Sequence, residues 1–373
     1  MSRGHVLVAP DKFKGSLAAD EVAERIVAGL AIARPGWPAL ALPVADGGDG
    51  TLDAALAAGF RRLDVRVTGP TGRLVDSAIA VRGDVAVVEM AAASGLVLLP
   101  DGPDPLGAGT HGTGELIRAA LDAGCTDIVL GIGGSASTDG GAGMLQALGA
   151  RLLDASGAEL PAGGAALARL DRVDLDGLDR RLAGTRLLLA TDVDNPLLGP
   201  LGAAAVYGPQ KGASPADVAT LDAALARWAE AIDPAAAGMP GAGAAGGVGY
   251  AALTVMRADR RPGIELVLEL IGFADRLAGA SLVITGEGSL DEQTLHGKAV
   301  AGVATVARGA GVPVVAVCGR CLLDPPTLLA AGISRAYPLS DIEPDVARSM
   351  ADPGPLLQVL AGRIADDWLS AAG

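Results

Sequence analysis

Lysine is rare in this sequence, and every lysine lies in a turn rich in glycine or aspartate, or beside one. Only four of the 29 basic residues are lysines: Lys12, Lys14, Lys211 and Lys298. Lysines that served only as surface cations would be scattered over helix faces. This sequence uses arginine wherever a generic surface cation is enough. A compact, flexible ammonium suits a phosphate that must be approached as a point charge. We therefore predict that at least two of these lysines belong to an active site.

Acidic residues occupy the same turns, or similar turns that follow predicted strands. Ligands of open α/β sheets bind at the carboxyl ends of strands, and carboxylates there are suitable ligands for Mg²⁺. The acidic candidates are Asp11 in the turn 9–16, Asp46 and Asp49 in the turn 46–50, Asp192 in the turn 192–196, and Glu287 and Asp291 in the segment 285–298, which also contains His296.

A glycine-rich loop, Gly131–Gly141, links a strand predicted over residues 127–132 to a helix predicted over residues 141–153. Its backbone N–H groups and the start of the helix are suited to an anion such as a phosphate. Glycine-rich loops are common, so the loop alone does not specify a function. Plain turns are the alternative for the aspartate-rich segments, because Asp and Gly favour turns.

The elements that must position these turns alternate between strand and helix at both ends of the chain. A continuous apolar run at His5–Ala9 predicts a buried parallel strand, and a helix from Ser16 should stop before Pro35. The C-terminal part repeats this alternation, which implies a parallel sheet with helices on both faces. In the middle, Leu63–Thr68, Ser77–Arg82 and Val85–Met90 are consecutive predicted strands with short connections. They indicate a mixed second domain.

We therefore predict an α/β protein with a discontinuous Rossmann-like domain, residues 1–65 plus 283–373, and an inserted mixed α/β domain, residues 66–282. A chain of 373 residues exceeds what one hydrophobic core usually serves.

Composition and charge exclude several classes of partner. The net charge of −14 disfavours binding to nucleic acid and to anionic membranes. The N-terminus has no signal-peptide pattern. The uncharged stretch 234–256 is rich in Ala and Gly and contains two prolines, unlike an inserted helix. We expect a cytoplasmic protein.

Other sequence patterns suggest chemistry but lack the context that it needs. Gly241–Gly246 matches the dinucleotide pattern GxGxxG, yet no predicted strand precedes it. The chain contains no Walker A sequence and no protein-kinase signature set. Cys318 and Cys321 form a CxxC, but a zinc site needs four ligands. Two small residues at a strand end are the simpler interpretation.

Eight segments together resemble the glycerate kinase type-1 family, in the same order over essentially the whole chain. They are VAPDKFKGSL, PVADGGDGT, GTGELI, GIGGSASTDGGAGM, DVDNPL, AAAVYGPQKGA, PGAGAAGG and TGEGSLDEQTLHGKA. Thr138 stands where that family more often has Asn. The resemblance implies a Rossmann-like domain with an inserted α/β domain and an active site in the cleft between these two domains. It also implies phosphorylation of D-glycerate by ATP with Mg²⁺, more often to 2-phosphoglycerate.

Phosphoryl transfer needs in-line positioning and stabilisation of charge. With this chemistry, the ATP phosphates are assigned to Gly133, Gly134, Ser135, Thr138, Asp139, Gly140, Gly141 and Lys211. Asp192 is the first candidate for Mg²⁺, with Asp46 and Asp49 as competitors. Lys12, Lys14 and Lys298 would meet the glycerate carboxylate or the migrating phosphoryl group. Asp11, Glu287 or Asp291 would accept the proton of the substrate hydroxyl, and the sequence leaves that choice open. A kinase for another small hydroxy acid and a non-catalytic hydroxy-acid sensor are the alternatives.

Overall fold

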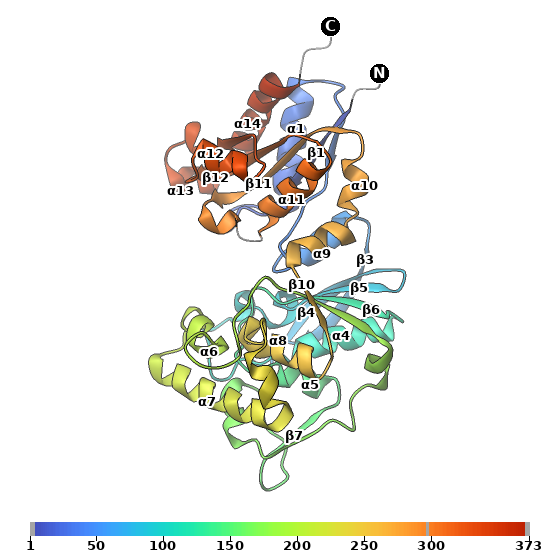
Figure 1. The fold of residues 1–373 in the computed structure, drawn as a ribbon, viewed down its shortest axis with the longest axis vertical. Helices are drawn as coiled ribbons and strands as arrows, with labels where there is room; N and C mark the ends of the chain where they lie inside the picture. Colours follow the sequence, from blue (N-terminus) through green and yellow to red (C-terminus); the bar gives the residue numbers. More distant parts are fainter. Residues whose placement is uncertain (1–3, 296–297, 370–373) are drawn as a thin grey trace. The chain divides into compact units, whose positions relative to one another are not determined.

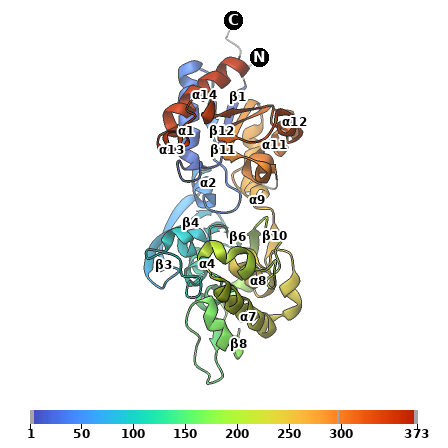
Figure 2. The same cartoon turned by 90° about the vertical axis from the view of Figure 1, so that its left-hand side faces the viewer.

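The computed structural model describes residues 4–295 and 298–369, and the chain divides into two units (Figures 1 and 2). The first unit takes in the chain up to Asp46, Asp53–Ala58 and the chain from Ile264 onward. The second unit takes in Gly47–Leu52 and Gly59–Gly263. Each unit has a sheet of its own.

The first unit contains a five-stranded sheet in the order β13-β12-β11-β1-β2, and all its neighbouring strands are parallel. Its strands are β1 (His5–Pro10), β2 (Ala39–Ala41), β11 (Ala280–Leu290), β12 (Val314–Cys321) and β13 (Arg335–Pro338). Its helices are α1 (Ala19–Ala33), α2 (Thr51–Ala57, whose first two residues belong to the second unit), α9 (Gly263–Leu270, whose first residue does so too), α10 (Phe273–Leu277), α11 (Ala299–Gly309), α12 (Pro325–Ala330), α13 (Val346–Ala351) and α14 (Pro353–Trp368).

The apolar run of β1 is buried because helices cover both faces of this sheet. Val6 and Val8 pack in a core with residues of α1 and α14, whereas Leu7 and Ala9 pack in a core with residues of α9, α11 and α12. Alternate side chains of a strand point to opposite faces, so both faces need apolar residues. The predicted Rossmann-like arrangement is confirmed for this sheet.

The second unit contains a six-stranded mixed sheet in the order β10-β9-β6-β5-β4-β3. The pairs β3·β4 and β4·β5 are antiparallel, and the other neighbouring pairs are parallel. Its strands are β3 (Arg61–Thr68), β4 (Leu74–Arg82), β5 (Val85–Glu89), β6 (Asp127–Gly131), β9 (Arg186–Ala190) and β10 (Asp259–Arg261). A separate two-stranded ribbon is formed by β7 (Arg151–Leu153) and β8 (Arg172–Asp174). Its helices are α3 (Ala91–Ser94), α4 (His111–Asp122), α5 (Ala142–Ala147), α6 (Ala203–Tyr207), α7 (Pro215–Ile232) and α8 (Ala244–Thr254).

The changes of unit come earlier in the chain than the predicted boundaries near residues 65 and 283. β3 pairs along its whole length with β4 of the second unit, so the first change precedes Arg61. Ile264, Val267 and Phe273, from α9 and α10, belong to the core of the first unit. The second change therefore falls before these helices instead of at β11.

One local prediction for the second unit is wrong. The helix predicted over residues 141–153 ends at Ala147, because Gly149 adopts a left-handed backbone with φ of +106°. Arg151–Leu153 then forms β7 instead. The uncharged stretch 234–256 contains α8, which is interrupted by left-handed residues such as Gly246. Every helix within the described ranges is too short or too polar to cross a membrane.

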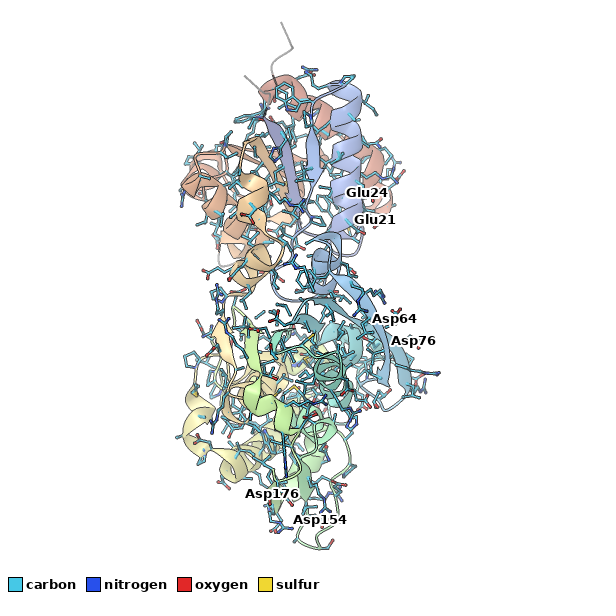
Figure 3. The ribbon with its side chains drawn as sticks, turned by 90° about the vertical axis from the view of Figure 1, so that its right-hand side faces the viewer. Glu21, Glu24, Asp64, Asp76, Asp154 and Asp176 are labelled. Atoms are coloured by element: carbon cyan, nitrogen blue, oxygen red, sulfur yellow. The ribbon has the colours of Figure 1, made fainter. Side chains whose placement is uncertain are left out.

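Acidic side chains lie on the surface of each unit, in keeping with the net charge of −14. Glu21 and Glu24 lie exposed on α1, Asp64 and Asp76 on the paired strands β3 and β4, and Asp176 beside the β7–β8 ribbon (Figure 3). These surfaces would repel a polyanion.

Candidate active site

The predicted acidic turns of the first unit meet at the carboxyl ends of β1 and β11. The N–H of Asp11 donates to the carbonyl of Gly286 at 2.8 Å, which places Asp11 directly beside Glu287 along the sheet edge. The turn that contains Lys14 lies against Gly288, since a Cβ atom on Gly288 would lie 3.5 Å from the backbone nitrogen of Lys14. The charge of Asp46 acts on both Asp11 and Glu287.

Burial and neighbouring carboxylates change the proton affinity of this cluster. Burial is the main cause that raises the pKa of Asp11 to about 7, and the negative charges of Asp46 and Glu287 add to it. The Lys12 backbone N–H, which donates to Asp11 Oδ1 at 2.7 Å, and the Lys12 ammonium act in the opposite direction. Asp11 is thus a carboxyl group that exchanges its proton near neutral pH.

Glu287 is held by two partners from the segment that follows β11. Burial raises its pKa, and the Thr294 hydroxyl and the Lys298 ammonium counteract this. Thr294 Oγ1 donates to Glu287 Oε1 at 2.5 Å, and Lys298 Nζ lies 3.7 Å from Glu287 Oε2. Asp291 adds negative charge to the same group. His296, which belongs to the predicted segment, lies outside the described residues.

In the second unit, the turn 47–50 packs directly on the glycine-rich loop. A Cβ atom on Gly133 would lie only 2.6 Å from the Gly48 Cα, so the two backbones approach at a distance that only glycine permits. A Cβ atom on Gly134 would lie 3.8 Å from the Asp49 Cβ. The structure therefore places exposed Asp49 beside the exposed part of the loop.

Glu89 fixes this turn from the end of β5, and sequence reasoning did not identify it. Its Oε2 accepts hydrogen bonds from the backbone N–H of Gly50 at 3.1 Å and of Leu52 at 2.9 Å. Glu89 is buried, and β5 ends beside Gly131, the first residue of the glycine-rich loop. Its carboxylate thereby joins the Asp49 turn to the strand edge that bears the loop.

The glycine-rich loop is accessible over only part of its predicted length. Gly133 is half-buried and Gly134 is exposed, whereas Ser135 and the segment Ser137–Gly141 are buried. Ser135, Thr138, Asp139, Gly140 and Gly141, all predicted to contact phosphate, lie in the buried part of the loop. Gly133 and Gly134 remain as the accessible part of the loop.

The Asp139 carboxylate accepts hydrogen bonds from N–H groups that we predicted to bind an anion. Its carboxylate accepts from the N–H of Gly141 at 3.0 Å, of Gly143 at 3.2 Å and of Thr110 at 2.9 Å, and from the Thr110 hydroxyl at 2.7 Å. Burial raises the pKa of Asp139, and these hydrogen bonds counteract it. The start of α5 is thus already occupied by a side chain of the protein.

Lys211, which we predicted to contact phosphate, is likewise buried beneath the loop and supports its backbone. Its Nζ donates to the backbone carbonyl of Ser137 at 2.5 Å. Burial lowers the pKa of Lys211 to about 7, and the charge of Asp139 acts in the opposite direction. A buried ammonium that is bonded to the loop backbone holds the loop from within.

Asp192 follows β9, the parallel neighbour of β6, so it lies at the same sheet edge as the glycine-rich loop. Its side chain is exposed, and Oδ1 accepts from the Gly263 N–H at 3.2 Å. In the part of the chain that the structure describes, no three Asp, Glu, His or Cys side chains converge as metal ligands. Mg²⁺ usually needs only one or two carboxylates beside waters and substrate phosphates, and exposed Asp192 and Asp49 fit that donor set.

Four residues that the sequence analysis did not identify hold the predicted ones in place: Glu89, Thr110, Thr294 and Trp228. The indole N–H of Trp228 donates to the Gly140 carbonyl at 3.1 Å. Glu89 gave a recognisable signal, since it is an acidic residue at the end of a predicted strand. The other three gave none, because their partners are distant in sequence or lie in a loop.

Carboxylates and lysines at the carboxyl ends of parallel strands, with a glycine-rich loop at such an edge, define an α/β phosphotransferase. A family model described as the glycerate kinase family matches residues 6–369. The chain belongs to the glycerate kinase family.

Relatives agree with this membership. The chain is 48% identical to a glycerate kinase of Bacillus subtilis and 45% identical to a glycerate 2-kinase of Escherichia coli, with 89% of each chain covered in both cases. It is also similar to a solved structure from Salmonella typhimurium LT2 assigned as glycerate kinase 2. That comparison gives a TM-score of 0.82 at 42% identity and covers 98% of this chain and 99% of the other.

Proposed function

We propose that this protein transfers the γ-phosphate of Mg-ATP to D-glycerate and forms 2-phosphoglycerate. Family membership and the name of the relative that is 45% identical, glycerate 2-kinase, support the reaction and its product. The observation that carries the chemistry is the cluster of Asp11 and Glu287 with lysines beside it.

Asp11 is the proposed base among the three candidates. A general base works best when its pKa lies near the working pH, and the pKa of Asp11 is raised to about 7. Glu287 is held by Thr294 and Lys298, so we assign it to positioning Lys298. Lys12, Lys14 and Lys298 then supply positive charge for the glycerate carboxylate or the transferred phosphoryl group.

In the second unit, Gly133 and Gly134 are proposed to receive the ATP phosphates. Asp192 and Asp49 would hold Mg²⁺, which, when bound, neutralises charge on the phosphate oxygens. Lys211 and Asp139 keep the loop in shape without contacting the nucleotide. Asp46 is assigned to the acidic cluster of the first unit, where its charge raises the pKa of Asp11.

Phosphorus NMR of the product formed from D-glycerate, ATP and Mg²⁺ tests the proposal. A phosphomonoester resonance split into a doublet by one proton identifies the 2-phosphate. A triplet identifies the 3-phosphate and overturns the choice of hydroxyl. If no phosphomonoester forms, D-glycerate is not the substrate, and other small hydroxy acids are to be tested next.

A further inference from the structure

Strands β11 and β12 continue past the point where β1 ends. β1 pairs with β11 only as far as Gly286, whereas β11 and β12 remain paired up to Leu290 and Cys321. Ser289 and Arg320 are opposite residues in this extension. Because all three strands are parallel, the extension lies at the carboxyl edge of the sheet, where ligands of open α/β sheets bind.

Arg320 brings an exposed guanidinium to this edge. Its Nε donates to the Ser289 hydroxyl at 3.2 Å, and within residues 4–295 and 298–369 its Nη1 and Nη2 atoms have no protein partner. Arg34 and Arg335 of the same unit are instead paired with acidic residues of α14. A guanidinium that is held at Nε keeps the forked end that matches both oxygens of a carboxylate.

The extension lies close to the proposed base. Asp11 lies beside Glu287, and Ser289 follows Glu287 by two residues of β11, about 7 Å along the strand. A hydroxyl and a carboxylate on neighbouring carbons, with a hydrogen bond of about 2.8 Å at each end, span a similar distance. A 2-hydroxy acid whose hydroxyl meets Asp11 therefore has its carboxylate within reach of Arg320.

We propose that Arg320 binds the carboxylate of D-glycerate, an inference that rests on the proposed function. Ser289 is a positioning residue, because its hydroxyl fixes the guanidinium through Nε. With the carboxylate held by Arg320, the lysines of the first unit remain for the transferred phosphoryl group, which a compact ammonium suits as a point charge.

Steady-state kinetics of the full-length enzyme test this assignment. Arg320→Met should raise the KM for D-glycerate about ten- to hundredfold, the loss expected for hydrogen bonds between charged groups. The KM for Mg-ATP and kcat should change little, because the carboxylate is bound equally in the ground state and the transition state. Arg320→Lys keeps the charge without the fork and should recover only part of the affinity. Ser289→Ala should raise the KM for D-glycerate less than Arg320→Met does.

Arg363→Met is the matched control, at an exposed arginine of α14, and should leave the KM for D-glycerate within about twofold of the native value. A fall in kcat with an unchanged KM for D-glycerate would transfer Arg320 to the phosphoryl group and overturn the inference. Native kinetics in Arg320→Met would overturn it as well, while leaving the proposed function intact. If the native enzyme itself does not phosphorylate D-glycerate, the proposed function fails and the inference fails with it.

Discussion

Lys211 and Asp139 interact electrostatically in the interior of the second unit, and each binds the backbone of the same glycine-rich loop. Lys211 Nζ donates to the Ser137 carbonyl, the Asp139 carboxylate accepts from the N–H groups of Gly141 and Gly143, and the charge of Asp139 acts on Lys211. The Lys211 ammonium therefore holds the loop by a backbone carbonyl, and the Asp139 carboxylate holds it by backbone N–H groups.

Removal of the Lys211 ammonium should destabilise the second unit. Lys211→Met keeps most of the side-chain volume but leaves Asp139 without its buried counter-charge, a change that costs about 3–5 kcal/mol. Urea unfolding measures the loss. Lys14→Met, at an exposed lysine, is the matched control and should change the free energy of unfolding by less than about 0.5 kcal/mol. In the double variant with Asp139→Asn, the two losses should be less than additive, and strict additivity would contradict the interaction.

Loss of the Glu89 carboxylate should release the turn that bears Asp49. Glu89→Ala removes the acceptor for the N–H groups of Gly50 and Leu52, and hydrogen exchange at both amides should become faster. Because Asp49 is a proposed magnesium ligand, the KM for Mg-ATP should rise as well. Glu89→Gln retains an acceptor oxygen and should keep much of the protection. Unchanged exchange in Glu89→Ala would show that the turn does not depend on Glu89.

Activity should depend on the ionisation of Asp11. If Asp11 is the base, kcat/KM falls as pH decreases through about 7, since only the carboxylate accepts a proton. Asp11→Asn should abolish turnover at every pH, and the rate–pH profile checks both points. An Asp11→Asn enzyme with the native profile would transfer the role of base to Asp291 or Glu287.

The raised pKa of Asp11 also predicts a change in stability with the opposite sign from that of a salt-bridged carboxylate. Between its unfolded pKa of 3.8 and its folded pKa of about 7, the native state binds the proton more tightly than the unfolded chain. Asp11 therefore makes the protein less stable as pH rises through this window. The Tm of Asp11→Asn should exceed that of the native protein at pH 8, and the gap should close below pH 4. A gap that does not change with pH would contradict the shift.

Asp192 and Asp194 lie two residues apart and should respond differently to the same change. Asp194 forms an ion pair with Arg260 at 2.5 Å, whereas Asp192 is the proposed magnesium ligand. Asp192→Asn should raise the Mg²⁺ concentration needed for half-maximal activity at least about tenfold. Asp194→Asn should leave that concentration within about twofold of the native value. Equal effects of the two variants would remove Asp192 from the metal site.

The strands with continuous apolar runs could be predicted from sequence, whereas features created by tertiary contact could not. β1 is recognisable because both of its faces are buried. β10 was missed because Asp259–Arg261 has three charged residues and is a strand only through its pairing with β9. The turns that hold the candidate site residues could be located from sequence because glycine, aspartate and lysine gather there. The burial of Lys211 was not predictable, since it depends on packing against a loop more than seventy residues earlier.

The order of strands in the first sheet has a consequence for biosynthesis. β1 is made first, yet its neighbour β11 comes from the far end of the chain. The whole of residues 59–263 therefore leaves the ribosome before that sheet can be completed, and we expect the second unit to fold first during translation. A nascent chain that stalls before Ala280 would carry Asp11 without Glu287 beside it.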